Sequence, residues 1–164
     1  MPDLDAMMEK YAAFEREAGR AITNFCAPDC SSCMTPCCEA EVCRESLDSP
    51  FLTAIIDKYP PETPYDHENG WITERGCALE VGRPPACYDY LCDGIIASIA
   101  SPRMRNAIKL LASLVSFIGE DALGSTHLAE IFNAEDLKKI DTVAFESKLA
   151  HAQDLLSNLK MLLD

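Results

Sequence analysis

The sequence predicts a mainly α protein: a single-domain helical bundle that carries an irregular, cysteine-rich metal-binding region at residues 26–92. Apolar residues recur every three or four positions in both terminal parts of the chain. The middle part carries most of the prolines and all nine cysteines. At 164 residues the chain is long enough for one domain, residues 1–164, and short for two.

Residues 4–25 are predicted to form one long helix. Their apolar positions alternate in steps of three and four, which is typical of one helix face; they are Leu4, Met7, Tyr11, Phe14, Ala18, Ile22 and Phe25. The acidic residues of this region are expected to form a solvated face; they are Asp3, Asp5, Glu9, Glu15 and Glu17. From Cys26 onward, prolines and small polar residues predict a loop.

A second helix is predicted directly after Ser49-Pro50, because serine is a favoured N-cap and proline is favoured in the first helical turn. Its apolar pattern ends at Tyr59, before two prolines. Residues 62–85 show little periodicity and predict an irregular segment with one short strand at residues 71–73.

Residues 94–164 are predicted to be helical. A short helix is expected from Gly94 to Ala100, followed by two longer ones whose apolar positions recur at helical spacing. These positions are Met104, Ile108, Leu111, Val115 and Ile118, and then Phe145, Leu149, Ala152, Leu156, Leu159 and Leu163. Ser125 and Asn133 are predicted to cap short helices between them. No linker separates the halves, so the cysteine-rich region is expected to pack on the helices.

The charge balance restricts the classes of partner. Lysine and arginine number 14 against 27 aspartates and glutamates, which gives a net charge of -13. Binding to nucleic acid or to an anionic membrane is therefore not expected, and a cationic or protein partner fits better. The chain shows neither an N-terminal secretory pattern nor 18 consecutive apolar residues, so a cytoplasmic location is expected. The exposed helix faces are also compatible with a homodimer.

Nine cysteines in a reducing compartment indicate metal ligation rather than a disulfide framework. Six lie between positions 26 and 43 and three between 77 and 92. Thiolates are soft ligands that favour zinc, iron–sulfur clusters or copper(I). The three histidines form no ligand-like pair. The Cys26, Cys30, Cys33 spacing is similar to the triplet of radical S-adenosylmethionine enzymes, but the chain is too short and too helical for their partial barrel.

Two separated motifs resemble those of the YkgJ-like CxxCxxCC family. The first half of the family pattern matches Cys30, Cys33, Cys37 and Cys38; the second half matches Gly76, Cys77, Arg83, Pro84, Cys87, Tyr90 and Cys92. Three departures are visible: three residues rather than two precede the paired cysteines, Ala78-Leu79-Glu80 replaces the usual small-Ile-Tyr after Cys77, and a cysteine often found upstream of Gly76 is absent. Either Cys26 or Cys43 could replace that ligand.

The resemblance implies metal chelation, by zinc or by iron. The predicted ligand set is Cys26, Cys30, Cys33, Cys37, Cys38, Cys77, Cys87 and Cys92. Only one Cys-x2-Cys step is present, and adjacent cysteines suit a larger cluster better than a single ion, which favours an iron–sulfur cluster slightly. Structural zinc is the commoner use of thiolates, so both cofactors remain open.

Three functional hypotheses follow. The first is a non-enzymatic metalloprotein that acts as a sensing, redox or partner-binding module, and it is favoured because no catalytic triad, phosphate loop or histidine-based zinc motif is present. The alternative is a metal- or cluster-dependent enzyme or accessory subunit for electron or group transfer, as in related flagellin lysine methylases. A third is a thiol redox protein that uses Cys37 and Cys38 directly.

Residues beside the cysteines have structural readings of their own. Arg83 is expected to anchor a carboxylate or a carbonyl. Tyr88 and Tyr90 are expected to pack over the metal site with their hydroxyls at the surface.

Overall fold

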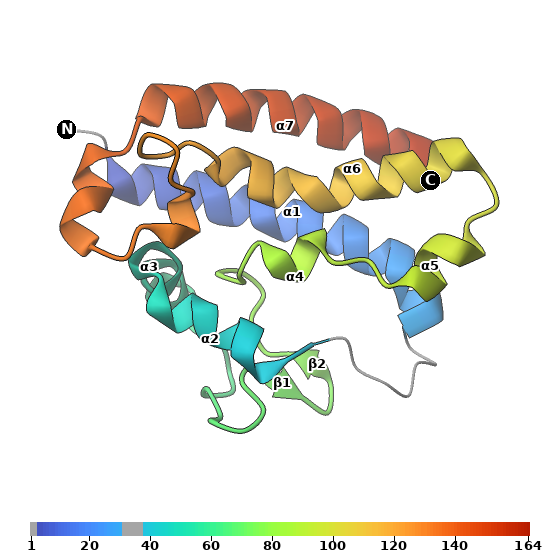
Figure 1. The fold of residues 1–164 in the computed structure, drawn as a ribbon, viewed down its shortest axis with the longest axis horizontal. Coiled ribbons are helices and arrows are strands. Elements are labelled where there is room, and N and C mark those ends of the chain that lie inside the picture. The colour runs from blue at the N-terminus through green and yellow to red at the C-terminus, as the bar shows by residue number, and fades with distance from the viewer. Residues whose placement is uncertain (1–2, 31–37) are drawn as a thin grey trace.

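Three long helices form one layer of the computed structural model, which describes residues 3–30 and 38–164, without the side chains of 27–30. These helices are α1 (Leu4–Cys30), α6 (Pro102–Gly119) and α7 (Thr142–Leu163). They contact one another pairwise and run side by side (Figure 1). The prediction of a mainly α fold is confirmed.

The periodic apolar residues of the terminal regions form the main core. The largest side chains that it buries come from all three long helices, and they include Tyr11, Phe14, Ile108, Leu111, Leu114, Ile118 and Leu156. Each such burial contributes about 1.5–3 kcal/mol relative to an exposed side chain. The apolar residues that predict the long helices therefore also pack these helices together.

Helix α1 is longer than predicted. It continues through Cys26 and Pro28 and ends at Cys30, so the expected loop does not begin at Cys26. Pro28 has no backbone N–H to donate to the carbonyl four residues earlier, and its ring crowds that carbonyl; the helix ends two residues later.

A second layer of short elements lies below the long helices in Figure 1. In chain order these elements are α2 (Ala40–Asp48), α3 (Pro50–Lys58), β1 (Ile72–Thr73), β2 (Gly76–Cys77), α4 (Ala86–Asp89) and α5 (Asp93–Ser98). The predicted cap is confirmed: the Ser49 side chain accepts a hydrogen bond from the Leu52 N–H, and Pro50 opens α3. The predicted strand and the short helix after position 94 are also present, whereas α2 was not predicted.

Two 3-10 helices, η1 (Leu128–Glu130) and η2 (Ala134–Lys139), connect α6 to α7. Asn133 caps η2 as predicted, because its side chain accepts a hydrogen bond from the Glu135 N–H. The cap predicted at Ser125 is wrong: Ser125 lies in a turn, and His127 caps η1.

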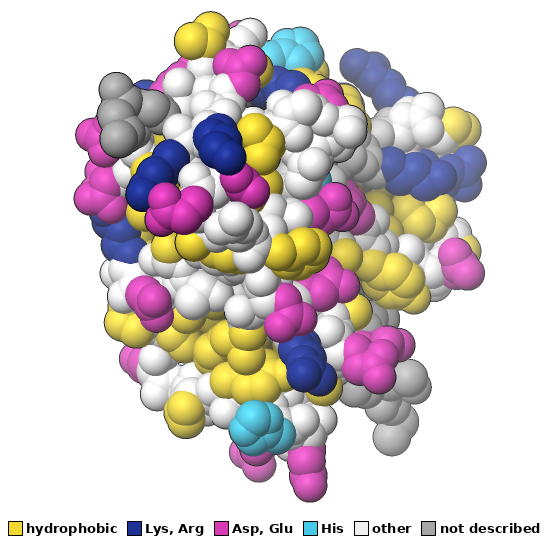
Figure 2. All heavy atoms as spheres, turned by 60° about the vertical axis from the view of Figure 1, so that its left-hand side comes forward, with side chains coloured by type: hydrophobic (Ala, Val, Ile, Leu, Met, Phe, Trp, Pro, Cys, Tyr) yellow, Lys and Arg dark blue, Asp and Glu magenta, His cyan; other side chains and the backbone are white. Residues whose placement is uncertain are grey.

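The acidic composition of the chain is visible on its surface. Acidic side chains are spread over the face shown in Figure 2, with apolar and basic ones between them. None of the described helices has both the length and the apolar composition needed to cross a bilayer.

Candidate metal centre

Cys43 lies on the buried face of α2, against the loop that precedes the hairpin. Gly70 in this loop has a φ of +65°, and a Cβ there would lie 2.6 Å from the Cβ and 2.9 Å from the Sγ of Cys43. Only glycine combines this conformation with so close an approach. Asp66 fixes the loop by accepting hydrogen bonds from the backbone N–H groups of Glu68 (2.9 Å) and Asn69 (2.7 Å). The thiol position of Cys43 is thus set by backbone packing.

Trp71 and Ser46 join the hairpin to α2. The indole N–H of Trp71 donates to the Ser46 hydroxyl (2.8 Å), and this hydroxyl donates to the carbonyl of Cys43 (2.7 Å). Trp71 and Cys43 belong to a small apolar cluster with Ile56 and Leu79. The chain has one tryptophan, so its fluorescence reports on the surroundings of Cys43.

Replacing Ser46 with alanine is expected to lower the free energy of unfolding by about 1–3 kcal/mol, because the buried indole N–H loses its acceptor. Urea unfolding followed by circular dichroism measures the change. Ser157→Ala is the matched control, since its hydroxyl donates to a carbonyl on the exposed side of α7; its effect should stay within about 0.5 kcal/mol. Equal losses in both variants would contradict the role of the Ser46 hydrogen bond.

Cys77 is placed by the hairpin. The two antiparallel strands pair Ile72 with Cys77 and Thr73 with Gly76. Gly76 adopts a φ of +105°, which favours glycine, and the Thr73 hydroxyl donates to its carbonyl (2.8 Å). The hairpin, which lies below α4 in Figure 1, therefore carries a half-buried Cys77.

Glu15 anchors the segment before α4, and α4 itself, to the long helix α1. Its carboxylate is fully buried and accepts three hydrogen bonds, from the N–H groups of Gly82 (2.8 Å) and Arg83 (2.9 Å) and from the hydroxyl of Tyr88 (2.7 Å). Burial raises the pKa of Glu15 to about 7, while these hydrogen bonds and the Arg83 charge oppose the rise. The expectation that Glu15 belongs to a solvated face is wrong, because its donors come from a distant part of the chain.

The two tyrosines also differ from expectation. The Tyr88 hydroxyl points into the core toward Glu15 rather than to the surface, and Tyr90 is 63% exposed rather than packed. A phenol hydroxyl buried beside a carboxylate gains a hydrogen bond that water would otherwise supply. Tyr88 therefore belongs to the anchor and not to a cover over the cysteines.

Arg83 is the cation beside the cysteines. Its Nε donates to the carbonyl of Leu79 (2.7 Å), which confirms the predicted anchoring role. Burial acts to lower the pKa of Arg83, but the nearby ionisable groups Tyr88, Cys77 and Glu15 outweigh burial and raise it overall. The guanidinium therefore stays charged next to the thiols.

Thiols from two distant segments influence the pKa of Cys87. The pKa of Cys87 is raised to about 12, first by loss of solvent around its thiol and then by the charges of Cys77, Cys43 and Cys38, with Arg83 opposing. Charges influence one another to this extent only at short range in a screened solvent. Cys38, Cys43 and Cys77 therefore lie in the electrostatic neighbourhood of Cys87, but not at the distances of a preformed ligand set. The sequence offered Cys43 only as a substitute ligand.

The other predicted ligands that the structure describes with side chains are Cys26 and Cys92. Cys26 is buried near the end of α1. Cys92 precedes α5, and its sulfur accepts a hydrogen bond from the Ile95 N–H (3.4 Å), so it caps that helix. The side chain of Cys30 and all of Cys33 and Cys37 lie outside the described residues.

Within the part of the chain that the structure describes, no three cysteine, histidine, aspartate or glutamate side chains come together closely enough to hold a metal ion. The predicted ligand set therefore stays a prediction. The chemistry of the donors fits a soft metal, because Cys43 and Cys77 pack in one cluster and Cys87 lies near them, with Arg83 as a nearby cation. Three further cysteines that the sequence assigns to the same site fall in residues 30–37.

No protein-family model, no curated protein and no solved structure significantly matches this chain. The resemblance to the YkgJ-like family thus stays an expectation that rests on the motifs. The sequence pattern indicated Cys43 only as a substitute ligand and placed Glu15 on a solvated helix face. A usable signal existed for Glu15, which lies four residues after Tyr11 and three before Ala18 and so belongs to their helix face.

Proposed function

We propose that this protein binds an iron–sulfur cluster or a zinc ion through cysteine thiolates and acts as a sensing, redox or partner-binding module. The observation that carries the proposal is the packing of Cys43 and Cys77, which are far apart in sequence, in one cluster, with Cys87 near enough for both to influence its pKa. Ionised thiols repel one another, and a bound cation or cluster offsets that repulsion.

The surrounding fold supports the same proposal. The segment from α2 to α4 has short elements and an apolar cluster that consists of only a few side chains, in contrast to the large core of the three long helices. A metal that links α2, the hairpin and α4 would add the stabilisation that so small a cluster does not supply.

The test is purification without oxygen, followed by measurement of iron, zinc, acid-labile sulfide and visible absorption. A brown protein with iron and sulfide would establish a cluster, and a colourless protein with stoichiometric zinc would establish a zinc centre. A protein purified with neither would contradict the proposal.

Single variants then test the ligands. Cys43→Ser and Cys87→Ser are each expected to lower the metal content per chain, because serine is a poor substitute for a thiolate. Ser157→Ala should keep the wild-type content. Removal of the metal by a chelator should change Trp71 fluorescence in the wild type, since Trp71 packs in the same cluster as Cys43. Full metal content in both cysteine variants would remove Cys43 and Cys87 from the ligand set.

A further inference from the structure

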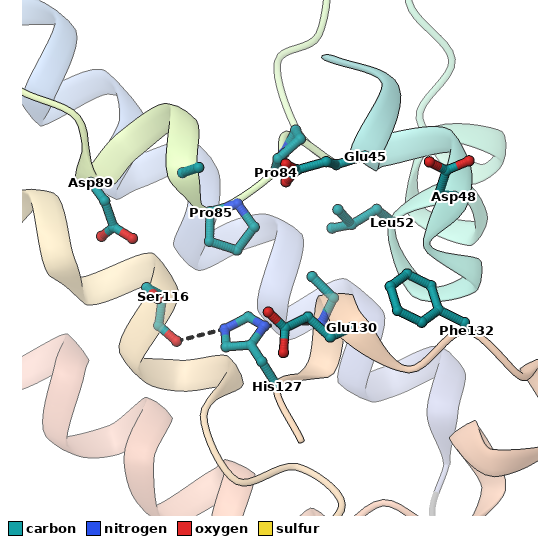
Figure 3. A pocket seen from close by; sticks show the side chains of 12 residues that line it. Glu45, Asp48, Leu52, Pro84, Pro85, Asp89, Ser116, His127, Glu130 and Phe132 are labelled. Atoms are coloured by element: carbon teal, nitrogen blue, oxygen red, sulfur yellow. Dashed lines mark hydrogen bonds between the residues drawn. The ribbon is translucent and has the colours of Figure 1, made fainter. Parts of the chain in front are cut away.

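A groove of about 450 Å³ runs between α2 and α3 on one side and α4, the end of α6 and η1 on the other. This is within the size range of ligand sites. Its apolar lining includes Leu52, Pro84, Pro85 and Phe132. Figure 3 shows four carboxylates around this lining: Glu45 and Asp48 from α2, Asp89 from α4 and Glu130 from η1.

His127 forms part of the groove wall and not a free base. Its Nδ1 accepts a hydrogen bond from the Ala129 N–H (3.1 Å), so the ring proton is assigned to Nε2. Nε2 then donates to the backbone carbonyl of Ser116 at 2.9 Å, the dashed line in Figure 3. Both ring nitrogens are engaged, so the groups that remain to face a ligand are the carboxylates and the apolar lining.

Among the described residues, the carboxylates of the groove have no lysine or arginine partner, although Asp89 accepts a hydrogen bond from Ser116. No lysine or arginine lines it, and none of the described ion pairs involves Glu45, Asp48, Asp89 or Glu130. Phe132 at its edge is 70% exposed. A ligand that combines positive charge with apolar groups satisfies both features.

We propose that this groove docks a lysine- or arginine-bearing segment of a partner protein, and that the cysteine centre sets the width of the groove. A small hydrated cation would leave Phe132 and the apolar lining uncovered. A second copy of this chain is opposed by its net charge of -13. A basic peptide segment places alkyl stems on the apolar lining and charged ends near the carboxylates.

The link to the cysteines follows from shared elements, and this part rests on the proposed function. Helix α2 carries Cys43 and also the groove residues Glu45 and Asp48. Helix α4 carries Cys87 and also Asp89. A metal that draws Cys43 and Cys87 together therefore fixes the separation of the two groove walls.

The test measures fluorescence anisotropy of a labelled short peptide that alternates lysine and leucine, added to the full chain as purified. Glu45→Gln with Glu130→Gln is expected to weaken binding by roughly tenfold, because two charges that face the peptide are lost. Glu62→Gln with Glu68→Gln is the matched control; it removes the same charge outside the groove and should change affinity by less than about twofold. Phe132→Ala should also weaken binding, whereas Val143→Ala, at an 80% exposed position on α7, should not.

The outcomes separate the two parts of the proposal. Equal weakening by the groove pair and the control pair, or no binding at all, would overturn the docking site. Competition by spermidine at the same concentration as the peptide would identify a small-cation site instead. Removal of bound metal should weaken peptide binding; an unchanged affinity would overturn the control by the cysteine centre and leave the docking site in place. A protein purified without metal contradicts the proposed function but leaves the peptide comparison fully informative.

Discussion

Replacement of Gly82 by alanine is expected to lower the free energy of unfolding by about 3–4 kcal/mol, from a left-handed backbone and from overpacking together. Gly82 has a φ of +81°, and an added Cβ would lie 2.7 Å from the Cγ1 of Ile56 and 3.3 Å from the carbonyl oxygen of Leu52. The backbone cannot move away freely, because the Gly82 N–H donates to Glu15 at 2.8 Å.

Gly124→Ala is the matched control for this experiment. Gly124 also has a positive φ, +60°, but an added Cβ would meet nothing within 4 Å. Its loss should be about 1–2 kcal/mol, the cost of the left-handed conformation alone. Both variants change the unfolded chain in the same way, so the difference in urea-unfolding free energy isolates the packing of α3 against Gly82. Equal losses would show that Ile56 and Leu52 can move to make room for the added methyl group, and would contradict the predicted overpacking.

Replacement of Glu15 by glutamine is expected to remove a pH-dependent part of the stability. The pKa of Glu15 is about 7 in the folded protein against an ordinary 4.5. The folded state therefore binds more protons than the unfolded state between these values. Its contribution is fully present below pH 4.5 and is lost as the pH rises through about 7. The loss amounts to about 3 kcal/mol, since each pKa unit is worth about 1.4 kcal/mol.

Urea unfolding across this pH range measures the effect. The stability advantage of the wild type over Glu15→Gln should shrink steadily as the pH rises from 4.5 to about 7 and stay constant above that range. At every pH the amide also leaves one backbone N–H of Gly82 or Arg83 without an acceptor, which costs about 1–3 kcal/mol.

The ionisable groups that face Glu15 do not change charge in this pH range, so they do not affect the comparison of wild type with Glu15→Gln. Burial raises the pKa values of Tyr11 and Tyr88 well above their usual range, so both stay neutral in the window, and Arg83 stays charged. Glu17→Gln, exposed on the same helix, is the control and should follow the wild-type curve. Parallel curves for wild type and Glu15→Gln would show that Glu15 titrates normally.

The sequence predicted the elements whose stability is local or follows an apolar period. Helices α3, α6 and α7 carry regular apolar faces, and Ser49 and Asn133 are caps that act within three residues. Helix α2 was missed because its buried face consists of Cys43 and Ser46 rather than an apolar stripe. Ser46 is buried because Trp71, twenty-five positions away, donates to it.

The candidate site was predictable in composition but not in arrangement. Cysteine spacing indicated a metal site and named Cys77 and Cys87. The proximity of Cys43 depends on the close approach of Gly70, and the position of α4 depends on Glu15. Both contacts join residues far apart in sequence, and no pattern within one helix or one turn encodes them.

The anchoring carboxylate on α1 also bears on whether the cysteine region can be transplanted. A peptide of residues 38–92 would contain Cys38, Cys43, Cys77 and Cys87 but would lack the acceptor for Gly82, Arg83 and Tyr88. Such an excised fragment would leave those donors to water and α4 without its attachment. The region is thus not a portable cassette in the manner of a small zinc finger, and a graft onto a foreign scaffold must bring a helix with a carboxylate at the position of Glu15.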